Sequence, residues 1–374
     1  MEFQFTEEQD AIREVAEGIF NGLITPDRVG EVEKTDERFD RALWAELAKS
    51  NLLGLGTPED LGGIGGGMVE IGQVLEAQGK VVAPIPLLAT LVEGVLPIAT
   101  FGSDELKAAW LPGVADGSLV LSAAMADAAA SPSLLPRVRA EKTDNGWSLT
   151  GTASAVPFAH VAQGVVVPAV SAGGVVVVVV AIDAEGVSQE RVETTNRAIH
   201  PHVSFAATPV ASSAVLGGPE VLERMLQWAQ TGLALIQVGV CDAALRQTAA
   251  HLNERTQFGR TLSSFQGTML RAADAGIDLE AVRVTAWQAA WRLDEHKPAA
   301  EAVLVAKWQA ADRGQRVVHA TQHLHGGTGA DISYPIHRYF LWGKQIELEL
   351  GGPSLQLSRL GELIAQRPDE VLAR

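Results

Sequence analysis

The segment Arg255-Thr256-Gln257-Phe258-Gly259-Arg260-Thr261-Leu262-Ser263-Ser264-Phe265-Gln266 separates two long helical patterns. It combines a guanidinium, an aromatic ring, a permissive glycine and amide side chains within twelve residues. A fixed cation that pairs bidentately with phosphate, beside a ring and an amide, would suit a nucleotide pyrophosphate. The alternative interpretation is an ordinary helix–helix turn whose polar side chains are solvated.

Helical spacing of apolar residues flanks this stretch on both sides. Before it, apolar residues recur at helical spacing from Val221 to Val240. After it, Ser263 or Ser264 is expected to cap a new helix that carries Phe265, Met269 and Leu270 inward. The stretch is therefore predicted to be a short polar break between two helices.

Composition and charge exclude several classes of protein. The chain has 374 residues, of which 47% are apolar and 20% charged, so it is predicted to be globular. Its formal charge of −16 argues against duplex nucleic acid as a partner, but one or two arginines could still serve a phosphorylated small molecule. A single cysteine, Cys241, leaves no internal disulfide, which fits a reducing compartment.

Targeting signals and membrane spans are also not expected. The N-terminal residues are acidic and lack the charge pattern and apolar core of a signal peptide. The longest apolar runs fall short of the roughly 20 residues that span a bilayer. We therefore expect a soluble, cytoplasmic protein.

The residue composition and the pattern of apolar residues change twice along the sequence. Residues 1–117 are predicted to be a helical domain, 118–215 a β domain, and 216–374 a helical bundle. The best strand signal is the run of six valines from Val175 to Val180. The expected helices lie over about 40–53, 68–79, 84–100, 103–116, 219–255, 263–294, 297–322, 335–347 and 353–366. The predicted fold class is α+β, mainly α.

Two local patterns invite a functional interpretation that we do not favour. The run Gly62-Gly63-Ile64-Gly65-Gly66-Gly67 follows no predicted strand and lacks the spacing of a nucleotide-binding loop, so it is interpreted as a connection between helices. His323 and His325 lie two residues apart without a third ligand nearby, so no metal site is predicted there.

Three further segments contain short motifs with glycine or proline at fixed positions. They are Gly56-Thr57-Pro58-Glu59-Asp60-Leu61-Gly62-Gly63, His323-Leu324-His325-Gly326-Gly327-Thr328-Gly329 and Tyr334-Pro335-Ile336-His337-Arg338. Together with the Arg255–Gln266 stretch, they resemble the motifs of the acyl-CoA dehydrogenase family in order and spacing. The family patterns are Pro-Glu-x-x-Gly-Gly, Arg-x-x-Phe-Gly, Gln-x-x-Gly-Gly-x-Gly and Tyr-Pro-x-x-Arg. The resemblance covers essentially the whole chain.

This resemblance implies FAD-dependent α,β-dehydrogenation of an acyl-CoA thioester, by subunits that share the cofactor. In the family, one subunit's β domain holds the isoalloxazine, and the neighbour's four-helix bundle holds the pyrophosphate and adenosine half. Carried over by motif, the cofactor-binding residues would be Arg255, Gln257, Phe258, Gln266, Gln322, His323, Gly326 and Gly327. His323 stands where the family has glutamine, with Gln322 one residue earlier.

The sequence departs from the family at the catalytic base. The position of the usual glutamate is Leu350, and the position used in another branch is Ala229, neither of which can accept a proton. Glu349 lies one residue away and could enter only through a slip of the loop. We therefore expect no catalytic residue in this chain, with Glu349 as the alternative base.

The β domain departs from the family as well. The segment that lines the flavin in the family falls on residues 125–132, and the one beside its ring on Ala155-Val156-Pro157. Both have lost polar side chains that a buried flavin would need. The resemblance is therefore strongest to the subunit without the base in α2β2 steroid side-chain dehydrogenases of actinobacteria.

The sequence leaves three hypotheses open. The first is a heterotetramer subunit that donates the adenosine half-site to a homologous catalytic subunit, in which the acyl-CoA is mainly bound. The second is a self-sufficient homo-oligomeric dehydrogenase that uses Glu349. The third is a catalytically silent binding or scaffold protein.

Overall fold

The structure is a computed structural model that describes residues 4–366. Contacts divide the chain into two compact units. Within the described range, the first comprises residues 4–23, 27–74 and 84–229, and the second residues 24–26, 75–83 and 230–366. Two helices, α4 (Met68–Val81) and α8 (Pro219–Glu254), run from one unit into the other.

Helices precede the sheet in the first unit. Thr6 and Gln9 form a reciprocal capping box, since each backbone N–H donates to the other's side chain, at 3.0 and 3.2 Å. The run Gly62–Gly67 connects two helices as predicted, and Gly63 packs so tightly on Thr57 that a Cβ would lie 2.1 Å from its carbonyl oxygen. The further elements before the sheet are α1 (Glu7–Leu23), α2 (Pro26–Val32), α3 (Arg41–Lys49), η1 (Leu52–Gly54), η2 (Glu59–Leu61), the π-helix η3 (Leu88–Val95), α5 (Leu96–Phe101) and α6 (Asp104–Ala115).

An eight-stranded sheet forms the rest of the first unit. Its order is β6-β7-β3-β2-β4-β5-β8, and β1 pairs parallel with β4. The predicted valine strand is β5, whose Val178 and Val180 pair with Val167 and Val165 of β4 in the buried core. The elements are β1 (Leu121–Ala123), α7 (Ala126–Ala130), β2 (Arg139–Thr143), β3 (Gly146–Ala153), β4 (Gly164–Ser171), β5 (Gly174–Ala181), β6 (Val187–Glu190), β7 (His202–Ala211), η4 (Ser212–Ala214) and β8 (Val215–Gly217).

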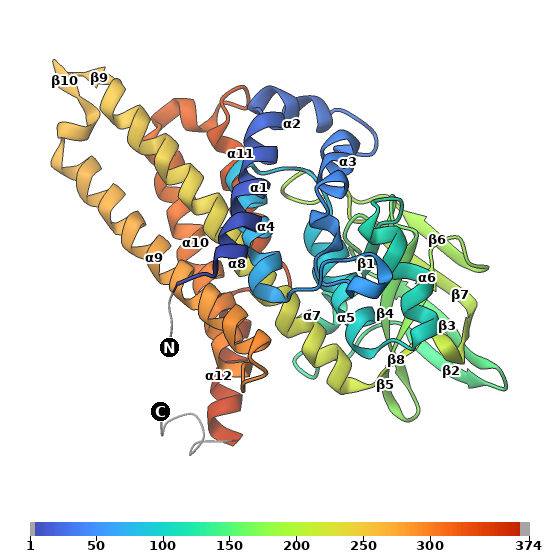
Figure 1. The fold of residues 1–374 in the computed structure, drawn as a ribbon. Helices are drawn as coiled ribbons and strands as arrows, with labels where there is room; N and C mark the ends of the chain where they lie inside the picture. Colours follow the sequence, from blue (N-terminus) through green and yellow to red (C-terminus); the bar gives the residue numbers. More distant parts are fainter. Residues whose placement is uncertain (1–3, 367–374) are drawn as a thin grey trace. The chain divides into compact units, whose positions relative to one another are not determined.

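The second unit is helical. Long helices lie side by side in it, and α10 packs against α9, α11 and α12 (Figure 1). After α8 come β9 (Thr256–Gln257), β10 (Arg260–Thr261), η5 (Leu262–Ser264), α9 (Gln266–Asp294), α10 (Ala300–Leu324), η6 (Gly326–Ala330), α11 (Ile336–Leu348) and α12 (Pro353–Gln366).

The predicted order of helices, sheet and helical bundle is confirmed, and so is the mainly helical α+β class. The domain boundaries at residues 117 and 215 stay a prediction. None of the helices within residues 4–366 has the length and apolarity needed to cross a membrane.

Candidate nucleotide half-site

The stretch between α8 and α9 is a β-hairpin. Strands β9 and β10 pair antiparallel, with Gln257 opposite Arg260 and Thr256 opposite Thr261. The two turn residues, Phe258 and Gly259, have φ values of 54° and 78°, the left-handed geometry that suits a tight hairpin. The Phe258 side chain is 91% exposed at the tip. Sequence reasoning predicted a turn here and missed the hairpin.

The hydrogen bonds and ring contacts that the hairpin's polar side chains make among residues 4–366 stay within the Arg255–Gln266 stretch. Arg255 is exposed, and its guanidinium has no hydrogen-bond or ion-pair partner among residues 4–366. Within the described chain, the Gln257 side chain donates to the Thr256 carbonyl oxygen next to it, at 2.8 Å. Arg260 lies over the Phe265 ring, 4.0 Å from its centroid, and Gln266 begins α9 as an exposed residue. The hairpin thus presents a free guanidinium, an amide and a ring to the outside.

The glycine-rich loop after α10 also faces outward. His323, Gly326 and Gly327 are exposed, while the Gln322 side chain donates to the Gly329 carbonyl oxygen at 3.0 Å and so closes the loop. A Cβ at Gly327 would meet no atom of the described chain within 4 Å. No atom of the described chain fills the space beside Gly327. The glycine therefore leaves room for a ligand to approach the backbone.

A pair of histidines connects this loop to the end of α8. The His325 and His251 rings stack with centroids 4.4 Å apart and planes at 21°. His251 lies one helical turn before Arg255, and His325 directly precedes Gly326. The structure therefore brings the loop and the end of α8 together, through two side chains that the motifs do not specify.

The turn after α11 holds both the family's base position and Glu349. Leu350 is buried and has a φ of 55°. Three buried side chains from three helices donate to the backbone carbonyl oxygens of this turn: Gln230 and Gln356 to Leu350, and Lys307 to Gly351 at 3.1 Å. The turn is thus held in one conformation from several sides.

Glu349 itself is engaged within the chain. Its carboxylate accepts a hydrogen bond from Gln345 at 3.0 Å, on the preceding turn of α11. Burial raises the pKa of Glu349, against the opposing effects of the Gln345 hydrogen bond and the Lys307 charge. The other position considered for a base, Ala229, is fully buried in α8.

In the β domain, the two segments that would border a flavin use their backbone donors internally. The Ala155 N–H donates to Nδ1 of His202 at 3.0 Å, and the Val156 N–H donates to the Pro201 carbonyl oxygen at 2.8 Å. Residues 126–130 form the short helix α7, whose Met125 carbonyl oxygen accepts from Ala129. These amides are therefore committed to the chain's own fold.

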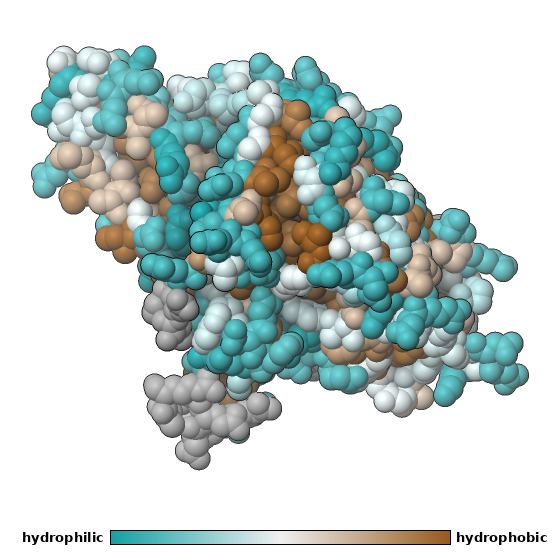
Figure 2. All heavy atoms as spheres, in the orientation of Figure 1, coloured by the Kyte–Doolittle hydropathy of each residue, from teal (hydrophilic) through white to brown (hydrophobic). Residues whose placement is uncertain are grey.

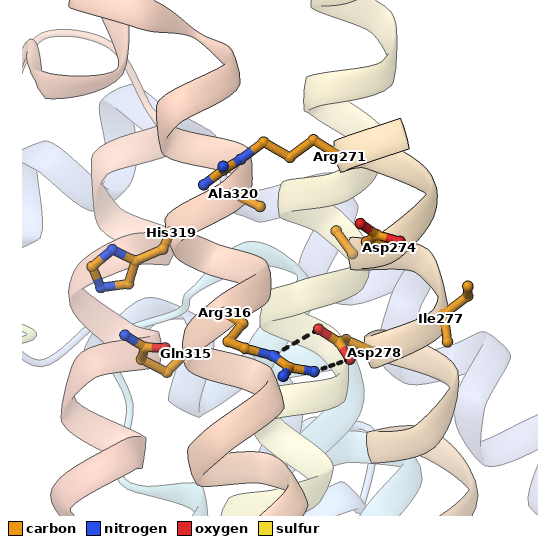
Figure 3. A pocket seen from close by; sticks show the side chains of 9 residues that line it. Arg271, Asp274, Ile277, Asp278, Gln315, Arg316, His319 and Ala320 are labelled. Carbon is orange, nitrogen blue, oxygen red and sulfur yellow. Dashed lines mark hydrogen bonds and ion pairs between the residues drawn. The ribbon is translucent and has the colours of Figure 1, made fainter. Parts of the chain in front are cut away.

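A groove along α9 and α10 lies apart from the predicted residues. Figure 3 shows Arg316 reaching across it to the buried carboxylate of Asp278, which also accepts from Arg313. Arg271, Asp274, Ile277 and His319 line the rest. Within residues 4–366, no three His, Cys, Asp or Glu side chains gather as a metal site.

Comparison with known proteins identifies the same family at both ends of the chain. The acyl-CoA dehydrogenase N-terminal domain model matches residues 6–118, and the C-terminal domain model matches residues 217–362. Acyl-CoA dehydrogenase FadE27 of Mycobacterium tuberculosis is 35% identical over 98% of this chain and 100% of its own length. FadE28 of the same organism is 31% identical over 96% of this chain and 98% of its own.

Solved structures agree with these relatives. A variant of the Tcur3481-Tcur3483 steroid ACAD has a chain 43% identical, with a TM-score of 0.91, covering 96% of this chain and 98% of that chain. The ChsE4-ChsE5 complex from Mycobacterium tuberculosis has a chain 36% identical, with a TM-score of 0.93, covering 98% and 99%. The FAD complex of PigA, 20% identical, shows the shared fold alone.

Proposed function

Because the chain belongs to the acyl-CoA dehydrogenase family, we propose that it is the FAD-clamping subunit of a heteromeric acyl-CoA dehydrogenase. It contributes the pyrophosphate and adenosine half-site to a homologous catalytic subunit, which holds the flavin ring, the base and most of the acyl-CoA. The complex removes hydrogen from the α and β carbons of the thioester. FAD supplies the hydride acceptor when bound.

The observation that carries the proposal is the unpartnered hairpin and loop. Arg255 has no anion to pair with among the described residues, although it lies beside the loop-anchoring His251. A guanidinium is the side chain best suited to a pyrophosphate, and the exposed backbone of Gly326 and Gly327 allows close approach of a ligand. Gln257, Phe258, Gln266, Gln322 and His323 would complete the contacts to this half of the cofactor.

The chain's own flavin-ring half fits a cofactor poorly. The amides of Ala155 and Val156 already donate within the β domain, and residues 126–130 are coiled into α7. A flavin ring buried there would leave polar edges without donors, which costs about 1–3 kcal/mol for each unpaired group. This favours a neighbour, rather than this chain, as the holder of the ring.

The missing base points in the same direction. Leu350 and Ala229 are buried aliphatic residues, and the Glu349 carboxylate is bonded to Gln345. A dehydrogenase without a base would lose a contribution of roughly 10²–10⁴-fold. A partner subunit that carries the base explains why this chain retains the residues for the pyrophosphate and adenosine half of FAD.

The outer face of α9 supports a partner chain. Leu270, Ile277 and Val284 lie seven residues apart and are 57%, 66% and 63% exposed. Helix α9 already buries its opposite face in the bundle, so a solitary surface helix should be polar here. Apolar side chains along the outer edge of α9 are visible in Figure 2. Residues repeated every seventh position form the seam on which a second helix packs.

Two of the similar solved structures are named for two proteins each, Tcur3481-Tcur3483 and ChsE4-ChsE5. The former is described as a steroid dehydrogenase. On this similarity we propose a steroid side-chain CoA thioester as the substrate of the complex, and α2β2 as its composition.

The test is expression of the chain alone and together with a homologous catalytic subunit. Alone, it should carry little flavin and show no acyl-CoA dehydrogenation with an artificial electron acceptor. The co-expressed complex should hold one FAD for each pair of different subunits and turn over. Stoichiometric flavin and turnover in the isolated homomer would overturn the proposal, and a complex that remains inactive would favour a scaffold role.

A further inference from the structure

The stacked histidines lie where the two parts of the proposed half-site meet. His325 is 4% exposed, and its ring has His251 on one side at 4.4 Å and Tyr334 at 5.2 Å. His251 is only partly buried, on the last turns of α8. The stack therefore bridges the base of the glycine-rich loop and the helix end that carries Arg255.

A hydrogen bond fixes the His325 ring in its plane. Nε2 of His325 lies 3.2 Å from Oγ1 of Thr248, also on α8. The Thr248 hydroxyl donates its proton to the Ala244 carbonyl oxygen at 2.7 Å, so its oxygen must accept from His325. His325 thus carries its proton on Nε2, and Nδ1 is an acceptor without a partner in the described chain.

Both rings are neutral near pH 7. Burial lowers the pKa of His325 to about 4, and burial together with the nearby Arg255 charge lowers the pKa of His251. Two neutral flat rings at this distance attract each other, by about 0.5–1.5 kcal/mol for aromatic pairs. The contact is therefore a favourable stack and not a clash of two cations.

We propose that His251 and His325 are a positioning pair that holds the Gly326–Ala330 loop against the end of α8, so that the Gly326–Gly327 backbone and Arg255 address the same nucleotide. The pair acts through the loop and does not itself touch the ligand. This inference rests on the function proposed above. Glycine-rich backbone has little stiffness of its own, so a ligand would otherwise have to order it at a cost in affinity.

The experiment uses the co-expressed complex and measures its dissociation constant for FAD and its melting temperature. His325→Ala should weaken FAD binding about tenfold, equivalent to about 1.4 kcal/mol, while the subunits remain associated. His251→Ala removes the same stack at a partly exposed position. Its FAD affinity can therefore be measured even if the buried variant His325→Ala does not fold. His325→Phe restores a flat ring and should recover most of the affinity.

His160→Ala is the matched control, since it removes a histidine ring that stacks on another ring, Phe158, at 6.2 Å. It should leave FAD binding unchanged. If His325→Ala and His251→Ala bind FAD like the parent, or if His160→Ala weakens binding equally, the positioning role is wrong. Arg255→Ala in the same complex separates the two proposals: unchanged FAD affinity there would reject the half-site itself.

Discussion

Lys307 shows how one residue fixes the turn where a base would be expected. Its side chain is fully buried, and its ammonium group donates to the carbonyl oxygens of Ile346, Glu347 and Gly351 at 2.9–3.4 Å. Burial lowers its pKa to about 8, against the opposing charges of Glu349 and Glu347. Removing an ammonium from water is costly, and the carbonyl dipoles at the C-terminal end of α11 offset that cost.

Replacing Lys307 should therefore loosen this turn. Lys307→Met leaves buried carbonyl oxygens without donors and should lower the free energy of unfolding by about 2–4 kcal/mol. Urea denaturation of the purified chain measures the change. Lys344→Met is the control, because Lys344 pairs with Glu347 in a partly exposed position and should cost less than about 1 kcal/mol. Equal effects of the two changes would contradict this account of Lys307.

Glu349 is the residue that separates the heteromeric from the homomeric hypothesis. Its carboxylate is bonded to Gln345, and the adjacent Leu350 is locked by Gln230 and Gln356. Glu349→Gln should leave kcat of the assembled complex within about twofold, because a group outside the reaction contributes none of the 10²–10⁴-fold effect of a base. A loss of a hundredfold or more would restore Glu349 as the base.

Buried neutral histidines make the fold sensitive to acid. The pKa of His200 is lowered to about 3 and that of His325 to about 4, chiefly by burial. Above about pH 6.5, these histidines are neutral in the folded and the unfolded chain, so they do not lower the free energy of unfolding. Below it only the unfolded chain takes up the proton, so each histidine costs about 1.4 kcal/mol per pH unit until its folded pKa is reached.

The measurement is the urea midpoint at pH 7, 6 and 5. The midpoint should fall with pH, and His200→Leu should reduce the slope. His323→Gln changes an exposed histidine and should leave the slope as it was. A midpoint that is flat between pH 7 and 5 would show that these two histidines titrate alike in both states.

At the scale of elements, periodicity explains what the sequence could predict. The helix expected over 219–255 is α8, and the one expected over 353–366 is α12, because long apolar repeats leave a strong signal. The β9–β10 hairpin was missed because strands of two residues have no period to detect. Its available signal was the glycine at the second turn position, Gly259.

The helix after the hairpin was predicted in the right place with the wrong face inward. Met269 and Leu270 are 51% and 57% exposed, and Phe265, not a serine, occupies the N-cap position of α9. The spacing of apolar residues shows that the helix has two apolar faces. It does not show which face packs inside the bundle and which face another chain covers. The glycine-rich loop and Arg255 were found because their motif is local, whereas the His251–His325 contact joins residues far apart in sequence.

Gly259 provides a test of the hairpin as an element. A Cβ at this position would meet no described atom within 4 Å, but its φ of 78° costs an alanine about 1–2 kcal/mol. Gly259→Ala should therefore distort the turn and weaken FAD binding by the complex several-fold. Gly267→Ala is the control, since Gly267 also faces open space but lies in α9, where alanine favours the helix by up to about 1 kcal/mol. FAD binding that is equal in the two variants would argue against a role for the hairpin geometry.

At the scale of the whole molecule, the hairpin and the outer face of α9 form one continuous structure. Helix α9 begins at Gln266, directly after the hairpin and its η5 turn, and the exposed seam starts one turn later at Leu270. A partner that received the hairpin would therefore also lie against the seam, and the charged groove beside it, with Asp278 and Arg316, would form a polar rim. FAD binding should then depend on subunit assembly.

Ile277 is the residue through which this dependence can be tested. It is 66% exposed at the centre of the seam, so Ile277→Glu should leave the isolated chain folded, with an unchanged circular dichroism spectrum. In the complex the carboxylate would be buried without a partner, at a cost of several kcal/mol, so subunit affinity should fall on the order of a hundredfold and bound FAD should be lost with it. Analytical ultracentrifugation and flavin absorbance measure both. Val15→Glu, which adds the same charge at an exposed apolar position of α1, should alter neither. Assembly that survives Ile277→Glu would place the partner on another face, and FAD that stays with this chain after dissociation would show that this chain holds the cofactor alone.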